Sequence, residues 1–429
     1  MENLALMPKY EAYKDSQVQW IGDIPANWYL EKAKWLFYKA DRKPLVDDDI
    51  VTCFRDGQVT LRKNRRTEGF TNALKEHGYQ RICKGDLVIH AMDAFAGAIG
   101  VSDSDGKSTP VYAACVPRKK GEVNSYYYAY YMRDLALSGF IVSLAKGIRE
   151  RSTDFRFNDF AELLLPFPDY EEQIRIANFL DKKTEQIDEA IAIKEQQISL
   201  LKERKQIIIQ QAVTQGLDPN VPMKDSGVDW IGKIPEHWEI KPLKHILKLK
   251  NLKIEAGKSN LEYLGMECVN SFDGTKNEIK SEADGLSTFF QVGDILFGKL
   301  RPYLAKVYVA DFEGVCSTEF LVYEVKRGSN AFFSKLMLSN GFISVVDAST
   351  YGSKMPRASS GFIGNLNIVN PPFEEQIKIS SFIDKQNELF DMNISLQKAQ
   401  IEKLKEYKTT LINSAVTGKI KITPEMVEQ

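Results

Sequence analysis

The sequence has few cysteines, few histidines and no catalytic signature. Its five cysteines are scattered and odd in number, which argues against a disulfide framework or a zinc knuckle. The four histidines stand in no metal-binding spacing, and no P-loop or G-x-S-x-G motif occurs. We therefore expect reduced thiols, a cytoplasmic protein, no metal site and no catalytic residue.

Long apolar runs and an excess of one charge are also missing. The longest apolar runs, such as the one around 207–209, fall far short of the roughly 20 residues that span a bilayer. We expect no membrane association. With 57 basic and 58 acidic residues the net charge is -1, so any binding of nucleic acid must use local basic patches.

A tandem repeat organises the 429 residues. The segment KDSQVQWIGDIPANW at 14–28 returns as KDSGVDWIGKIPEHW at 224–238, with ten of fifteen positions identical. PDYEEQI at 168–174 returns as PPFEEQI at 371–377, and each copy ends on AVT. The offset is 210 residues for the first match and 203 for the later ones. One framework has therefore been used twice.

The middles of the two copies, 30–167 and 240–370, barely resemble each other apart from a weak match of GDLVI to GDILF. Both contain short β-rich runs between Gly, Asp and Asn turns, which predict mixed α/β domains. Four tryptophans, Trp20, Trp28, Trp230 and Trp238, are expected to anchor the cores of these domains. Two copies of a scaffold with different central segments suit a protein in which each copy recognises a different target.

A heptad pattern follows each EEQI segment. Its apolar positions are Ile187, Ile191, Ile198, Leu201 and Ile208 in the first copy and Ile394, Ile401, Leu404 and Leu411 in the second. This spacing is typical of a coiled-coil seam, and Gly216 and Gly418 favour helix ends. Each helix should extend over roughly 43 residues, or about 65 Å.

Two arrangements of these helices are open. Each helix can lie on its own domain as an ordinary amphipathic helix. Matched registers, including the polar interruptions at Lys194/Gln397 and Lys205/Lys408, favour the two helices packing on each other instead. We expect an antiparallel pair that separates the two domains and relates the copies by a pseudo-twofold axis, an α+β fold overall.

Basic side chains in the loops of the middles are candidates for contacts with DNA. They are Arg62, Lys63, Arg65, Arg66, Lys146, Arg149 and Arg151 in the first copy, and Lys299, Arg301, Lys354 and Arg357, with Tyr303, in the second. Such cations neutralise phosphates, and arginine also binds guanine edges. A short basic run is more often solvated surface, but 146–151 and 354–357 both lie just before the helix entries.

Two motifs favour an alternative interpretation, in which the chain is an adenine methyltransferase. Residues 370–373, NPPF, match N-P-P-[YF], and FAGAIG at 95–100 resembles a loop that holds S-adenosylmethionine. About 270 residues separate the motifs, and neither recurs in the other copy. The proline pair is also explained as a helix start. A third hypothesis is that the chain is a coiled-coil adaptor without affinity for DNA.

The junction AVTQGLDPNVPMKDSGVDWIGKIPEHW at 212–238, the EEQI helix entries and the AVT helix ends closely resemble bacterial type I restriction-modification specificity subunits. The resemblance covers essentially the whole chain. It implies two target recognition domains, 1–167 and 219–370, and two conserved helical regions, 168–218 and 371–429.

This resemblance also implies partners and a division of labour. Each domain would read one half of a bipartite target in double-stranded DNA. The helices would dock two methyltransferase subunits, and translocating restriction subunits would join them. S-adenosylmethionine is expected in the methyltransferase subunits and not in this chain, which would be a non-catalytic recognition subunit.

Overall fold

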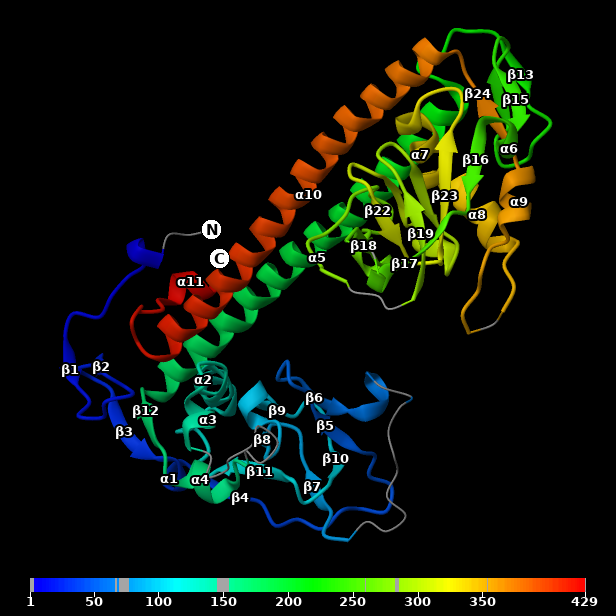
Figure 1. The fold of residues 1–429 in the computed structure, drawn as a ribbon. Coiled ribbons are helices and arrows are strands. Elements are labelled where there is room, and N and C mark those ends of the chain that lie inside the picture. Colours follow the sequence, from blue (N-terminus) through cyan, green and yellow to red (C-terminus); the bar gives the residue numbers. More distant parts are fainter. Residues whose placement is uncertain are drawn as a thin grey trace. The chain divides into compact units, whose positions relative to one another are not determined.

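The computed structural model describes residues 4–65, 68, 77–144, 154–258, 260–281, 285–352 and 354–428 (Figure 1). The chain forms two compact units, Met1–Ile193 with Ala399–Gln429, and Lys194–Lys398. Both ends of the chain therefore belong to the first unit. None of the helices in the described part of the chain combines the length and the apolar character that crossing a bilayer requires.

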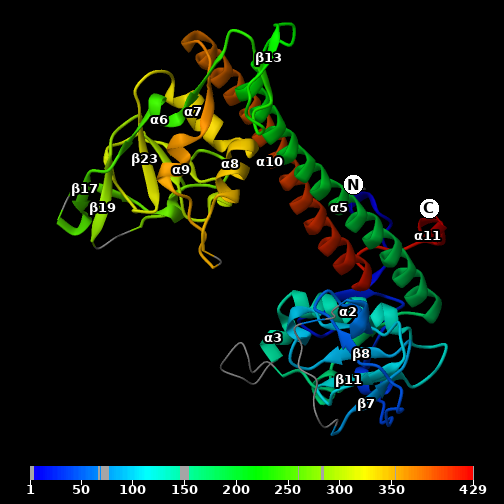
Figure 2. The same cartoon turned by 90° about the vertical axis from the view of Figure 1, so that its right-hand side faces the viewer.

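The first unit is built on a four-stranded antiparallel sheet of order β4-β11-β8-β9, with α2 packed on it (Figure 2). Smaller pairs join β1 to β2, β12 to β3, β5 to β6 and β10 to β7. The elements are η1 Leu4–Leu6, β1 Tyr13–Asp15, β2 Asp23–Pro25, β3 Tyr29–Lys32, α1 Ala33–Leu36, β4 Phe37–Lys39, β5 Val51–Cys53, β6 Val59–Leu61, η2 Arg62–Asn64, β7 Gln80–Ile82, β8 Leu87–His90, η3 Ala94–Ala96, β9 Ile99–Val101, β10 Gly106–Ser108, β11 Tyr112–Pro117, α2 Ser125–Leu137, α3 Phe140–Leu144, α4 Phe157–Ala161 and β12 Leu164–Phe167.

The second unit repeats this plan with a sheet of order β16-β23-β20-β21 and a second four-stranded sheet, β17-β19-β22-β18. The pairs β13-β14 and β15-β24 complete it. The elements are β13 Met223–Asp225, β14 Lys233–Pro235, β15 Glu239–Pro242, α6 Leu243–Ile246, β16 Leu247–Lys250, β17 Lys253–Glu255, η5 Ala256–Lys258, β18 Glu262–Leu264, η6 Met266–Cys268, β19 Leu286–Phe290, β20 Ile295–Gly298, η7 Pro302–Leu304, β21 Val307–Val309, β22 Gly314–Cys316, β23 Phe320–Val325, α7 Asn330–Leu338, α8 Asn340–Ala348, α9 Ser360–Asn365 and β24 Asn367–Asn370.

The central strands are buried on both faces in each unit. In β8, Leu87 and Ile89 join the large core beneath α2, while Val88 joins a separate cluster on the other face. In β20, Ile295 belongs to the large core and Leu296 to a second cluster. Successive side chains of a strand point to opposite faces, so these short, wholly apolar runs form central strands covered on both sides.

Two long helices follow the two mixed α/β regions, as the heptad pattern predicts. Helix α5 spans Tyr170–Gln215, 46 residues, and α10 spans Phe373–Val416, 44 residues, so each is about 65 to 70 Å long. The first turns carry Glu171 and Glu172 or Glu374 and Glu375, which suit the positive end of a helix dipole. A short helix, α11, spans Pro424–Glu428.

The two helices pack antiparallel within each unit. In the first unit the Lys408 ammonium contacts Asp188 at 2.7 Å. In the second unit Lys205 contacts Asp391 at 2.8 Å. Both partners are shifted by the same 203 residues, so the contact is repeated with its roles exchanged. The predicted antiparallel pairing is confirmed. The polar interruptions Lys205 and Lys408 form ion pairs, and Lys194 donates a hydrogen bond to Gln397 at 3.1 Å.

Each unit is completed by the end of the helix that begins in the other unit. The end of α10 enters the first unit, where the Tyr127 hydroxyl donates to the Val416 carbonyl at 2.9 Å and Ile420 is buried in the core. The end of α5 enters the second unit, where Val213 is buried. The helices end at Gly216 (φ +77°) and Gly418 (φ +74°), in the left-handed conformation that glycine adopts most readily.

Candidate nucleic-acid interface

A buried bond between tryptophan and glutamate fixes the scaffold of each unit. The Trp28 indole donates to Glu172 at 3.0 Å, and the Trp238 indole donates to Glu375 at 2.9 Å. Both indoles are completely buried. The repeated W-I-G-x-I-P-x-x-W and EEQI segments are thus two halves of one contact, since each supplies one partner.

The glutamine of EEQI fixes a second point of the scaffold. The Gln173 amide oxygen accepts from the Asn124 backbone N–H at 2.8 Å, and Asn124 caps α2. Gln376 accepts in the same way from Ser329, which caps α7, also at 2.8 Å. The first turn of each long helix therefore holds the start of the helix that packs on the sheet.

The weakly matched GDLVI and GDILF segments share a third contact. Asp86 pairs with Arg42 at 2.7 Å, and Asp294 pairs with Lys250 at 2.6 Å. Hydrogen bonds that Arg42 donates to the Asp86 carboxylate raise the pKa of Arg42 above its ordinary value. Both aspartates are nearly buried, so each pair ties β4 or β16 to the turn before the central strand.

These contacts place the same surface in each unit, where the central strand ends. The Ala91 N–H, after β8, donates to the Val111 carbonyl at 3.0 Å, and the Lys299 N–H, after β20, donates to Glu319 at 2.9 Å. The Phe155 N–H then donates to Ala91, as the Ala358 N–H does to Lys299. Two loops thus meet at one place in both units, one after the central strand and one before the EEQI helix.

In the second unit these loops bring the predicted basic residues together. We call residues 299–304, together with 351, 352 and 354–357, the loop pair. The Arg301 N–H donates to the Pro356 carbonyl at 2.8 Å, and Tyr351 and Arg357 exchange backbone hydrogen bonds. The sequence of the loop pair holds four basic residues and no acidic one. Segments about 50 residues apart therefore form one basic surface.

The cations of the loop pair differ in how they are held. Arg357 makes a forked contact with Glu319, with its Nε at 3.1 Å and its Nη2 at 3.0 Å from the carboxylate oxygens. Hydrogen bonding to that carboxylate raises the pKa of Arg357 above its ordinary value. Arg301 and Lys354 are exposed, as is Tyr303, and Lys299 is half-buried.

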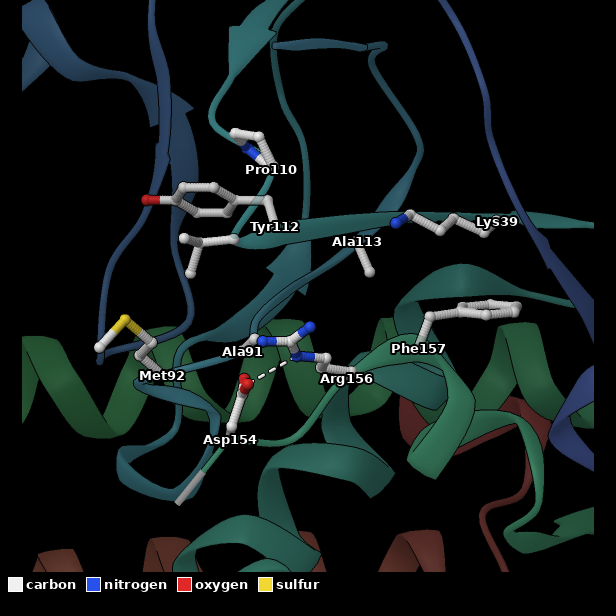
Figure 3. Close-up of a pocket in the computed structure, with 10 residues that line it drawn as sticks. Lys39, Ala91, Met92, Pro110, Tyr112, Ala113, Asp154, Arg156 and Phe157 are labelled. Atoms are coloured by element: carbon white, nitrogen blue, oxygen red, sulfur yellow. Dashed lines mark hydrogen bonds and ion pairs between the residues drawn. The ribbon is translucent and has the colours of Figure 1, made fainter. Parts of the chain in front are cut away.

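In the first unit the same place is hollow. A cavity of about 620 Å³ is lined by ten residues, among them Lys39, Met92, Tyr112 and Arg156 (Figure 3). Figure 3 shows Arg156 in the middle of the cavity, with Lys39 to one side and Met92 to the other. Arg156 pairs with Asp154 at 2.6 Å and stays largely exposed. Burial raises the pKa of the Tyr112 hydroxyl to about 12.

The predicted cations of the first unit lie on η2, directly after it, or outside the described residues. Lys63 pairs with Asp49 at 2.5 Å, and Arg65 pairs with Asp56 at 2.6 Å and covers the Phe54 ring. The Arg62 Nε donates to Thr52 at 3.3 Å. Four candidates lie outside the described residues, namely Arg66, Lys146, Arg149 and Arg151.

The seam residues differ in how deeply the helices bury them. Ile187, Ile198, Ile394, Ile401 and Leu411 are buried, whereas Ile191, Leu201, Ile208 and Leu404 are half-buried. Ile209, one position after Ile208, is only 3% exposed because it packs into the core of the second unit. At Ile208 and Ile209, α5 therefore packs against both the partner helix and the core of the second unit.

Sequence reasoning missed Lys39, Arg156 and the exposed Tyr351. Lys39 ends a strand more than 100 residues before Arg156, and neither belongs to a basic run. The pairing of β4 with β11 brings Lys39 to the cavity, and the hydrogen bond from the Phe155 N–H to Ala91 brings the neighbouring Arg156. The available signal was the repeat itself, because Arg156 stands two residues beyond the equivalent of Arg357 at the 203-residue offset.

The methyltransferase-like motifs have structural roles. Asn370 ends β24, and the Pro371 carbonyl accepts from the Gln376 side chain at 2.8 Å. In FAGAIG, Gly97 takes φ +92° at the turn between η3 and β9. Among the described residues no cluster of His, Cys, Asp or Glu is placed to hold a metal ion.

Comparison with known proteins finds relatives of this chain. Residues 235–406 match the type I restriction modification DNA specificity domain. The chain is similar to the specificity subunit of the Escherichia coli type I restriction enzyme EcoDI, at 23% identity over an alignment of 294 positions that covers 62% of this chain and 66% of that protein. The chain thus spans about two thirds of the length of that relative.

Two solved structures share the fold. One is a chain from a study of complex assembly and conformational transition of the type I R-M system, with a TM-score of 0.68 at 12% identity over 92% of this chain and 98% of that one. The other is the HsdS subunit from Thermoanaerobacter tengcongensis, with a TM-score of 0.55 at 15% identity over 92% and 98%. With its doubled scaffold and paired long helices, the chain is similar to the specificity subunits of type I restriction-modification systems, and its residues 235–406 match their DNA specificity domain.

Proposed function

We propose that the chain reads a bipartite DNA target with one half-site for each of two target recognition domains, 1–167 and 219–370. The observation that carries this proposal is that one scaffold presents two different surfaces at the same place. After β8 the chain reads Ala91-Met92-Asp93, and after β20 it reads Lys299-Leu300-Arg301. Different side chains at equivalent positions suit the reading of different bases.

Local charge supports contact with DNA although the chain as a whole is close to neutral. Lys299, Arg301 and Lys354 lie on a surface whose loops hold no acidic residue. Lysine and arginine neutralise phosphates, and arginine also reads guanine through two hydrogen bonds. The proposed role of Lys63, Arg65 and Arg357 is weaker, because carboxylates of the same unit already pair with them.

The long helices are the proposed docking site for two methyltransferase subunits, which restriction subunits then join. Leu200 and Ile207 lie seven residues apart on α5 and are 56% and 46% exposed. Leu389 and Leu396 are spaced in the same way on α10 and are 53% and 54% exposed. Apolar rows outside the seam need a covering surface. S-adenosylmethionine would be bound by the methyltransferase subunits.

The helices are also proposed to fix the spacer between the half-sites. Each is one continuous helix with residues in both units, α5 from Tyr170 to Gln215 and α10 from Phe373 to Val416. Deleting one turn from each helix should alter the spacer length without altering either half-site. Since the proposed target is DNA and the five thiols are free, we place the protein in the cytoplasm.

A domain exchange tests the proposal. Residues 240–370 are replaced by the same region of a relative, and the methylated sequence is determined by methylome sequencing of cells that carry the system. One half of the methylated target should change while the other half and the spacer stay the same. A change in both halves would contradict the assignment of one half-site to each domain.

A binding experiment separates this proposal from a coiled-coil adaptor. The chain assembled with its methyltransferase partner should bind duplex DNA with an affinity that falls as salt rises, because phosphate contacts release counterions. An assembled complex without affinity for DNA would favour the adaptor.

A further inference from the structure

We infer that Arg301 is the residue with which the second unit selects a guanine in its half-site. This inference rests on the proposed function and adds a specificity-determining residue to it. Arg301 is exposed on the loop pair, and among the described residues no carboxylate forms an ion pair with it. A guanidinium with free donors can bind the O6 and N7 atoms of guanine in the major groove at the same time.

The backbone around Arg301 is fixed before any ligand arrives. Its N–H donates to Pro356 at 2.8 Å, and its carbonyl accepts from Leu304 at 2.9 Å. Pro302 follows and is buried. Arg301 itself has φ +48°, in the left-handed region that side chains other than those of glycine and asparagine rarely occupy. Such a conformation persists only where surrounding contacts impose it, and it is concentrated at functional sites.

The forked contact between Arg357 and Glu319 gives these two residues a positioning role. Glu319 lies just before β23, and its carbonyl accepts from the Lys299 N–H. Its carboxylate holds Arg357, whose N–H and carbonyl are bonded to Tyr351. The pair therefore holds one loop against the other. The charge of Arg357 is neutralised within the unit by Glu319. The charge of Arg301 stays available to a ligand.

The remaining cations of the loop pair are less suited to reading a base. Lys299 is half-buried, its N–H donates to Glu319 and its carbonyl accepts from Ala358. Lys354 is exposed, but an ammonium is a point charge without the fork that discriminates guanine. Both suit phosphate contacts.

The first unit has a different side chain at the position of Arg301. Counting from the shared bonds at Ala91 and Lys299, this position is Asp93. Asp93 accepts from Arg55 at 2.8 Å, and Arg55 comes from the turn between β5 and β6. The two units thus offer unlike groups at one place, and the inference applies to the second half-site alone.

Selection from a pool of randomised duplex DNA tests the inference, with the full chain assembled with its methyltransferase partner. Arg301→Lys keeps the charge without the fork. Arg301→Gly removes the side chain and keeps the backbone conformation, because glycine adopts positive φ freely. Both variants should lose preference for one guanine of one half-site by about 5- to 150-fold, with the other half-site unchanged. Arg327, an exposed arginine after β23, gives matched controls as Arg327→Lys and Arg327→Gly, which should leave the preference intact.

The outcomes separate the inference from the proposed function. If the wild type selects a bipartite target and both Arg301 variants select the same target, the inference is wrong and the proposed function stands. The same holds if Arg301→Gly weakens binding to every sequence alike, because that result describes a phosphate contact. If the wild type selects no bipartite target, the proposed function itself fails.

Discussion

The two units agree in their buried bonds and differ in the loops that those bonds support. The tryptophan–glutamate distances differ by 0.1 Å, at 3.0 and 2.9 Å, and both EEQI glutamines accept at 2.8 Å. Beyond the central strand one unit has Asp93 and the other Arg301. Buried polar groups must keep their partners, whereas exposed loop residues are free to change. Recognition can therefore vary without loss of the fold.

The largest expected effect comes from removing a scaffold tryptophan. Trp28→Ala should cost about 3–5 kcal/mol of unfolding free energy, because a fully buried indole and its bond to Glu172 are lost. Hydrogen exchange should show lost protection in α2 and β8, with β20 unaffected. Trp238→Ala should show the reverse.

Trp35, which is 62% exposed, supplies the control for this comparison. Trp35→Ala should change stability by less than about 0.5 kcal/mol. If Trp28→Ala weakened both units equally, the two scaffolds would not be independent, and the comparison between them would fail.

A smaller effect separates the two glycines that end the long helices. Alanine at either position meets a positive φ, at a cost of about 1–2 kcal/mol. A Cβ at Gly418 would also lie 2.6 Å from the Pro25 ring, whereas one at Gly216 would lie 3.3 Å from Trp238. Gly418→Ala should therefore be worse than Gly216→Ala by about 1–2 kcal/mol in urea unfolding. Equal losses would show that the Pro25 contact relaxes freely.

The smallest effect is a pH dependence confined to the first unit. Burial lowers the pKa of His90, although nearby Asp93 partly opposes the shift. The unfolded chain then takes up the proton first, so stability should fall as the pH drops below about 6.5. The Asp93 N–H donates to the His90 ring at 3.0 Å, and protonation of that nitrogen removes the acceptor.

Thermal unfolding between about pH 7 and pH 5 checks this dependence. His90→Gln should flatten the pH profile of the first unit. The second unit has Gly298 at the equivalent position and provides an internal control. A His90→Gln profile as steep as that of the wild type would assign the dependence to other groups.

The repeat and the helices could be predicted from the sequence because they depend on strong local patterns. Heptads and end glycines gave helices close in length to α5 and α10, and matched polar interruptions gave the antiparallel pairing. The role of Glu172 was not predicted. Its carboxylate accepts from Trp28 and Tyr10. A residue 144 positions from its partner leaves no local signal.

The structural likeness of segments 30–167 and 240–370 also could not be predicted from the sequence. Strands β7, β8, β10 and β11 correspond to β19, β20, β22 and β23, yet buried strands need only apolar side chains of suitable size, so almost no identities remain. The GDLVI match was the visible part, because Asp86 and Asp294 each need a cation. The meeting of 299–304 with 354–357 could not be predicted because backbone hydrogen bonds between loops depend on no particular side chain.

The way in which the last residues of α10 complete the first unit bears on how the protein is made. A ribosome releases every segment of the second unit, residues 194–398, before it releases Leu411 and Ile420, which the core of the first unit buries. The domain that is synthesised first is thus the last to close. Until the C-terminus emerges, the nascent N-terminal domain exposes part of its core, and it is then most exposed to proteases and most in need of a chaperone.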